Sequence, residues 1–274
     1  MGVAERSGTV RVGGRVVAWR ALGSGPPLLL VNGYAGTSSD WDPRFLDALA
    51  RSFELILPDN RGVGGSDRGA PEDMLTIDAL ARDVERVLDA CGIERAHLAG
   101  WSMGGYIVQR LTALAPARVQ SLALLATDPG GPEAVISTRE AWETLTDDSG
   151  TPRAQARRLI ELLFPPGVSA QVDAEAGEVV AAGRARLSRG ALRAQEAAII
   201  AFHRKEPSPL APEAIPSVLI VHGDADVVIP PANAALLERR WPGARVERIA
   251  GAGHAFMAQE PERVAALMRE LALG

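Results

Sequence analysis

A serine flanked by glycines is the residue of this sequence whose setting most clearly suggests chemistry. Ser102 lies in Gly100-Trp101-Ser102-Met103-Gly104, directly after a predicted strand and directly before a predicted helix. A sharp turn from strand to helix strains the backbone at the serine and leaves no room for side chains at the flanking glycines. The turn also lifts the hydroxyl to a helix N-terminus, where negative charge is stabilised. We therefore predict that Ser102 is a nucleophile; a serine that only caps the helix is the alternative.

A serine hydroxyl needs a general base, and the sequence contains four histidines. His97 lies within a predicted strand and is expected to pack in the sheet, whereas His203 lies in a helical region, where it could line a pocket or face solvent. His222 ends a predicted strand, and His254 follows the last predicted strand in a glycine-containing loop. Because such a loop can reach a nucleophile at the same edge of the sheet, we predict His254 as the base of Ser102, with His222 as the alternative.

The histidine needs an acid that orients it, and three aspartates follow predicted strands. Asp224 and Asp226 both come after the apolar run 218–221, and Asp128 comes after an earlier strand. Position alone does not separate these three, and each is also compatible with a turn or a helix cap.

The elements that must position these residues alternate between strands and helices. Short continuous apolar runs such as 27–31 are typical of strands buried on both faces, and helical spacing separates them. This alternation predicts an α/β fold with a mostly parallel sheet and helices on both faces. The predicted strands are 9–12, 16–19, 27–31, 53–57, 96–100, 119–126, 217–221 and 245–249, and the predicted helices are 40–51, 76–91, 104–114 and 261–272.

The alternation stops after the sixth predicted strand. Between residues 129 and 212 the sequence contains alanine- and arginine-rich helical segments, which are broken at Pro152, Pro165-Pro166, Gly190 and Pro207. We therefore predict a helical insertion at 129–212 and a core domain made of 1–128 and 213–274.

Composition excludes several classes of function. The 274 residues carry a net charge of −5, and their basic residues are scattered, so no nucleic-acid partner is expected. The single cysteine, Cys91, cannot form an intrachain disulfide, and no cluster of metal ligands is present. Residues 1–7 have no apolar stretch of a secretory signal, and no apolar run is long enough for a membrane span, so we expect a cytoplasmic protein without a membrane partner.

These features resemble the α/β-hydrolase family across nearly the whole chain. The order serine, acid, histidine is that of the family, and Gly253-His254 resembles its histidine loop. Gly223-x-x-Asp226-x-x-x-Pro230 resembles the acid turn of the family, which favours Asp226 over Asp224 and leaves Asp128 as the third choice. The helical insertion matches the cap that roofs the pocket in this family.

The resemblance also covers two loops. Residues 58–66 resemble the arginine–glycine loop beside the active site of the family. The glycines of this loop also come near a dinucleotide-binding fingerprint. However, Asp67 occupies the position of the third glycine and no helix begins there, so we do not expect NAD binding. The family commonly has His-Gly-aromatic after the third strand, and this chain departs from it with Asn32-Gly33-Tyr34. Because an oxyanion hole uses backbone N–H groups, the resemblance still implies Tyr34 and Met103 as donors.

The resemblance implies a serine hydrolase that cleaves a carboxylic ester, or an ester-like bond, of a small organic substrate through an acyl-enzyme on Ser102, without metal or organic cofactor. Lactonases, C–C bond hydrolases and cofactor-free perhydrolases use the same triad, and non-enzymatic small-molecule receptors share the fold, so both alternatives stay open. A dehalogenase of this fold would have a carboxylate where Ser102 lies. Candidate pocket residues, all beside the nucleophile or in the insertion, are Trp101, Trp142, Phe164, Phe202 and His203.

Overall fold

One sheet of eight strands forms the centre of the molecule. The computed structural model describes residues 5–69, 74–205 and 217–274. The strand order is β1-β2-β4-β3-β5-β6-β7-β8; β1 and β2 pair antiparallel with their neighbours, and the remaining pairs are parallel. The mostly parallel sheet predicted from the sequence is therefore confirmed. The strands are β1 (Glu5–Val12), β2 (Arg15–Gly23), β3 (Pro27–Val31), β4 (Glu54–Pro58), β5 (Ala96–Trp101), β6 (Val119–Leu125), β7 (Val218–Gly223) and β8 (Arg245–Ile249).

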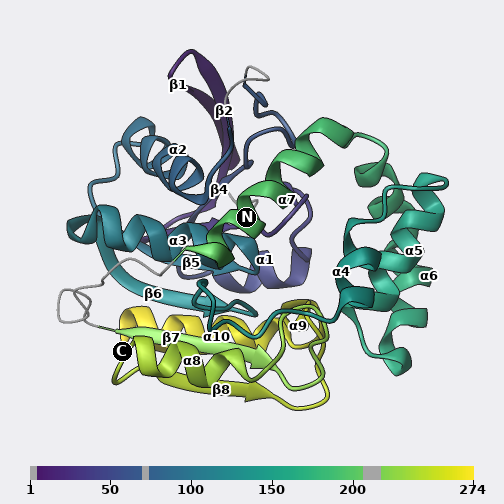
Figure 1. The fold of residues 1–274 in the computed structure, drawn as a ribbon. Coiled ribbons are helices and arrows are strands. Elements are labelled where there is room, and N and C mark those ends of the chain that lie inside the picture. Colours follow the sequence, from purple (N-terminus) through teal and green to yellow (C-terminus); the bar gives the residue numbers. More distant parts are fainter. Residues whose placement is uncertain (1–4, 70–73, 206–216) are drawn as a thin grey trace.

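Helices cover both faces of the sheet because both faces are apolar (Figure 1). Within β6, for example, Leu122 and Leu124 pack into one core cluster, and Ala123 and Leu125 pack into the other. The first cluster is completed by α2 (Ile77–Ala90), α3 (Met103–Leu114) and α8 (Asn233–Arg240); the second is completed by α1 (Pro43–Ala50), α9 (Phe256–Gln259) and α10 (Pro261–Leu273).

Among the described residues, four further helices lie between β6 and β7, in the region predicted as an insertion; we call them the cap helices. They are α4 (Arg139–Thr146), α5 (Pro152–Leu163), α6 (Pro166–Arg184) and α7 (Arg189–Arg204). Figure 1 shows α4, α5 and α6 grouped at one side of the molecule, with α7 running back from them towards α2 and α3.

The breaks predicted in this region coincide with helix starts. Pro152 and Pro166 occupy the first position of α5 and α6, where proline costs no hydrogen bond, and Gly190 lies in the first turn of α7. Pro207 and the predicted borders at residues 1, 212 and 213 lie outside the described residues. The helices α8 and α9 were not among those predicted from the sequence.

Local sequence explains the tightest connections. The hairpin between β1 and β2 turns at Gly13 and Gly14, which have φ of 55° and 83°, a conformation that glycine adopts without strain. Thr76 caps α2 by accepting a hydrogen bond from the N–H of Ala79. None of the described helices has the length and apolar character needed to cross a membrane.

Candidate active site

The turn at Ser102 joins β5 to α3 and has the strained backbone that the motif predicts. Ser102 has φ 56° and ψ −121°, which residues other than glycine rarely adopt. A Cβ on Gly100 would lie 2.2 Å from the carbonyl oxygen of Gly104, and a Cβ on Gly104 would lie 2.1 Å from that of Val31. Gly100 therefore lets the turn close on itself, and Gly104 lets α3 approach β3. The Oγ1 of Thr127 donates to the Ser102 carbonyl at 2.9 Å and helps to hold the turn.

A buried histidine–aspartate pair lies in the loops after β7 and β8. The Nδ1 of His254 is 2.8 Å from Oδ2 of Asp226, and both side chains are almost fully buried. The other oxygen, Oδ1, accepts hydrogen bonds from the N–H groups of Val228 and Ile229 at 2.8 and 2.9 Å. Burial alone would raise the pKa of Asp226, but the charge of His254 and the hydrogen bonds of His222 and His254 outweigh burial and lower it. Asp226 is therefore an ionised carboxylate, and the Nδ1 of His254 that faces it is a hydrogen-bond donor.

The serine turn and the histidine loop meet through Trp101. Trp101 directly precedes Ser102, and its indole N–H donates to the backbone carbonyl of His254 at 3.0 Å. The two rings also pack together, with centroids 5.1 Å apart. On the other side, a Cβ on Gly33 would lie 3.6 Å from Oγ of Ser102. The structure thus gathers the loops after β3, β5 and β8 at the carboxyl edge of the sheet.

The other candidate bases have different partners. His222 is fully buried, and its Nε2 lies 2.8 Å from the carbonyl oxygen of Ile229 and 3.4 Å from Oδ2 of Asp226. His222 therefore donates towards these oxygens and supports the carboxylate, a contact that sequence reasoning missed. The ring of His97 lies in β5 and contacts the Oγ of Ser121 at 2.8 Å.

The other two candidate acids do not contact His254. Asp224 is exposed, and its Oδ1 accepts a hydrogen bond from the N–H of Gly251 at 2.6 Å. Asp128 is buried and accepts from the hydroxyl of Tyr106 at 2.6 Å, and Nε2 of His203 lies 3.1 Å from both of its oxygens. Asp128 therefore forms a second pair with a histidine, one that links the end of β6 to the cap helix α7.

The loop after β3 shows how asparagine serves in the place of the usual histidine. Oδ1 of Asn32 accepts from the N–H of Gly33 at 2.7 Å, and its Nδ2 donates to the carbonyl of Thr37 at 2.8 Å. Asn60 donates to the Asn32 carbonyl at 3.0 Å. The side chain of Asn32 thus closes the loop that carries Tyr34, one of the two predicted oxyanion donors, and Met103 begins α3 directly after Ser102.

Residues 26–171, more than half of the chain, match the sequence model of the α/β hydrolase fold family. The chain belongs to this family. A protein of Azorhizobium caulinodans named putative carbamate hydrolase RutD is 32% identical over 92% of this chain and 91% of its own. A thermophilic esterase from Thermogutta terrifontis superposes with a TM-score of 0.74 at 25% identity, covering 98% of this chain and 97% of its own. An enol-lactonase from Burkholderia xenovorans has the same fold, with a TM-score of 0.77 at 24% identity over 97% of this chain and 100% of its own.

In this α/β hydrolase, the predicted pocket residues mainly contact other side chains. Trp101 packs on His254, Phe202 stacks on Tyr106 with ring centroids 4.8 Å apart, and His203 contacts Asp128. Phe164 is buried in the core cluster that includes α1 and α10, and Trp142 packs partly buried against the other cluster. Within the part of the chain that the structure describes, no group of three or more His, Cys, Asp or Glu side chains is placed to hold a metal ion.

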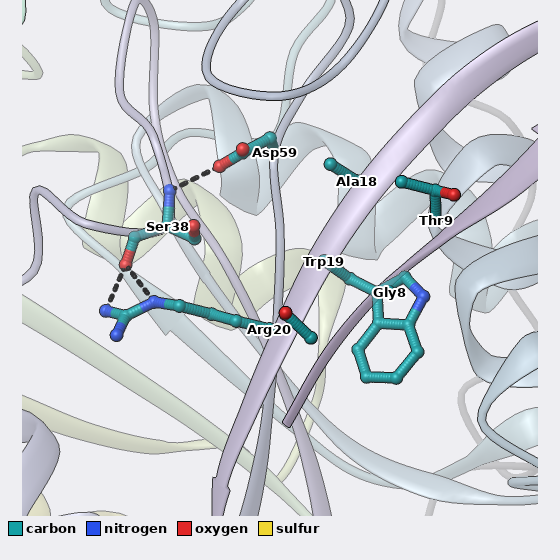
Figure 2. Close-up of a pocket in the computed structure, with 8 residues that line it drawn as sticks. Gly8, Thr9, Ala18, Trp19, Arg20, Ser38 and Asp59 are labelled. Atoms are coloured by element: carbon teal, nitrogen blue, oxygen red, sulfur yellow. Dashed lines mark hydrogen bonds between the residues drawn. The ribbon is translucent and has the colours of Figure 1, made fainter. Parts of the chain in front are cut away.

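A cavity of about 350 Å³ lies elsewhere, between β1, β2 and the loop that contains Ser38 (Figure 2). Its polar groups bind one another: Oδ1 of Asp59 accepts from the N–H of Ser38 at 2.7 Å, and Arg20 donates to the Ser38 carbonyl at 2.6 Å. The predicted catalytic residues are not among those that line it. The candidate active site is therefore the carboxyl edge of the sheet around Ser102.

Proposed function

We propose that this α/β hydrolase cleaves the ester bond of a small organic substrate through an acyl-enzyme on Ser102. The hydrogen bond between Asp226 and His254, beside the strained turn that carries Ser102, is the observation on which the proposal rests. A neutral histidine whose Nδ1 is held by a carboxylate has its Nε2 available for a serine proton.

The chemistry follows from this arrangement. His254 takes the proton of Ser102 as Oγ attacks the ester carbonyl, and the backbone N–H groups of Tyr34 and Met103 bind the oxyanion that forms. Each such donor typically contributes about 3 kcal/mol to the transition state. His254 then protonates the leaving alcohol, and water hydrolyses the acyl-enzyme by the reverse sequence of proton transfers. Asp226 fixes the tautomer of His254 and stabilises the imidazolium.

The chain supplies every group that these steps require, so the proposal includes no metal and no organic cofactor. The substrate is proposed to be a small molecule rather than a nucleic acid, since the net charge is −5.

A carbamate is the second candidate substrate. The observation that favours it is the 32% identity to a protein named putative carbamate hydrolase over nearly the whole of both chains. A carbamate carbonyl is attacked by a serine through the same tetrahedral intermediate, so the roles proposed for Ser102, His254 and Asp226 are unchanged. The two candidates differ only in the group that leaves and the group that stays on the serine.

The nucleophile is tested by labelling with a fluorophosphonate, followed by mass spectrometry of the peptides. We expect the adduct on Ser102, and we expect Ser102→Ala to lower kcat for p-nitrophenyl acetate by about 10⁶-fold while the protein stays folded. An adduct on another residue, or a Ser102→Ala variant that hydrolyses the ester at the parental rate, contradicts the proposal.

A panel of substrates then separates the possible bonds. Short and long p-nitrophenyl esters, a p-nitrophenyl carbamate, lactones and β-diketones are compared by kcat/KM with the same titrated enzyme. We expect turnover of the esters. Tight binding of a ligand without multiple turnover of any of them would instead identify a receptor with a hydrolase-like fold.

A further inference from the structure

The loop that carries the proposed oxyanion donor Tyr34 is held at both ends by the core domain. At its start, Asn60 donates to the carbonyl of Asn32 at 3.0 Å. At its end, Ser38 is bound by two core side chains: its N–H donates to Asp59 at 2.7 Å, and its carbonyl accepts from Arg20 at 2.6 Å, as Figure 2 shows. The tip between these anchors, residues 34 and 35, is contacted by the cap helix α7.

The tip is a tight turn with a strained residue. The N–H of Gly36 donates to the carbonyl of Gly33 at 3.3 Å and closes a turn whose two central residues are Tyr34 and Ala35. Ala35 has φ 61°, the left-handed conformation of the third residue in a type II turn, where glycine is preferred. Rotating the peptide between Tyr34 and Ala35 would relieve this strain and give the common type I turn. The observed turn therefore depends on a contact that holds this peptide in place.

Gln195 of the cap helix α7 makes that contact. Its side chain is fully buried, Oε1 accepts from the N–H of Ala35 at 2.9 Å, and Nε2 donates to the carbonyl of Arg61 at 3.1 Å. Because one partner is a donor and the other an acceptor, the amide can lie in only one orientation. The Arg61 carbonyl belongs to the loop after β4, so the cap reaches the tip while bound to a second loop of the core.

We propose that Gln195 is a positioning residue for the oxyanion hole: by binding the N–H of Ala35 it anchors the tip of the turn between the cap and the core, and thereby fixes the place of Tyr34, whose N–H belongs to the preceding peptide. This inference rests on the proposed function, since it is the oxyanion that the Tyr34 N–H would bind. It gives the cap a role in the chemical step that is separate from the shape of the pocket.

The test replaces Gln195 and measures rate per active site. Active sites are counted by fluorophosphonate titration, so unfolded molecules do not contribute. We expect Gln195→Ala to lower kcat for p-nitrophenyl acetate by about tenfold per titrated site, with KM within about twofold of the parent. An alkyl trifluoromethyl ketone, which forms a hemiketal oxyanion on the serine, should bind more weakly by the same factor.

Glu196→Gln is the matched control. Glu196 is the next residue on α7, and it binds the side-chain hydroxyl of Tyr34 at 2.8 Å rather than the backbone of the tip. Glutamine keeps an acceptor oxygen there and loses the ion pair with the exposed Arg193. We expect kcat and the inhibitor constant of this variant to stay within about twofold of the parent.

Parental kcat and inhibitor affinity in Gln195→Ala would overturn the proposal, as would a loss confined to the number of titrated sites. The activity of Ser102→Ala tests the proposed function separately, and none of the results for Gln195→Ala depends on it.

Discussion

Two buried aspartates at neighbouring strand ends each contact a histidine, and the two pairs differ in what the histidine can do. Asp226 follows β7 and lies 2.8 Å from Nδ1 of His254, which comes from a loop of the core. Asp128 follows β6 and lies 3.1 Å from Nε2 of His203, which comes from the cap helix α7. The residue types, the burial and the distances are similar, so pairing alone does not identify a catalytic acid and base.

The second ring nitrogen separates the two pairs. Nδ1 of His203 lies 3.0 Å from the carbonyl oxygen of Ile199, so both of its nitrogens face acceptors, an arrangement that favours the doubly protonated ring. Burial lowers the pKa of His203, but the hydrogen bond and charge of Asp128 outweigh burial and raise it. Because both ring nitrogens of His203 face oxygen acceptors, neither is free to accept a proton from a serine. His203 is therefore suited to link the cap to the core, whereas His254 is suited to act as a base.

The largest effect that distinguishes the pairs is expected from replacing each aspartate by asparagine. Asp226→Asn should lower kcat for p-nitrophenyl acetate by about 10⁴-fold, because the amide no longer holds His254 in the tautomer that accepts the serine proton. Asp128→Asn should lower kcat by less than about tenfold, since its carboxylate contacts His203 and not the proposed base.

Both variants are compared per active site titrated with a fluorophosphonate, and their folding is checked by circular dichroism. Equal losses of kcat in Asp226→Asn and Asp128→Asn would remove the distinction between the pairs. A larger loss in Asp128→Asn would transfer the role of the acid to that residue.

Much of the site around Ser102 could be predicted from the sequence because its residues lie at one edge of a parallel sheet. Apolar runs identified strands such as β3, β4 and β7, and chemically active residues follow directly after several of the predicted strands. Since parallel strands end at one edge, Ser102, His254 and one of three aspartates were expected to approach one another there, and the resemblance to the family favoured Asp226 among the three. The strain at Ser102 was expected as well, because the bend between β5 and α3 leaves the chain no other path.

The contact between Asp128 and His203 could not be predicted from the sequence, because no local sequence pattern indicates it. His203 lies 75 positions further along the chain, on a cap helix whose direction depends on several loops and on packing against α2. Gln195 was missed for the same reason: a buried glutamine has no sequence signature when both of its partners are backbone groups. Contacts between the cap and the core are set by tertiary packing, and spacing within a helix does not report them.

A smaller effect, on stability, follows from the charge of His203. Its pKa is raised in the folded protein, so its stabilising contribution is complete below the unfolded value of about 6.5 and is lost as pH rises through the folded value. We expect His203→Gln to lower the free energy of unfolding by about 2 kcal/mol near pH 5.5, with the deficit shrinking towards pH 9. Urea unfolding of both proteins across this range measures the difference.

The titratable groups that face His203 are Asp128 and Tyr106, and burial and the charge of Asp128 raise the pKa of Tyr106 well above its ordinary value. Tyr106 therefore keeps its proton between pH 5.5 and 9, and its ionisation does not contribute to the change in the deficit. A deficit that stays constant across this range would show that His203 binds Asp128 without a charge.

The smallest effect is expected at Asp224, two residues before Asp226 in the same turn. Its carboxylate is exposed and accepts one hydrogen bond from the N–H of Gly251, and an asparagine oxygen can accept the same bond. We expect Asp224→Asn to change kcat by less than about twofold and the free energy of unfolding by less than about 0.5 kcal/mol. The asparagine variants of these two aspartates in one turn would then differ by about four orders of magnitude in kcat, because only Asp226 is buried against His254. A loss in Asp224→Asn that approached the loss in Asp226→Asn would mean that the whole turn, and not the buried carboxylate, orients the base.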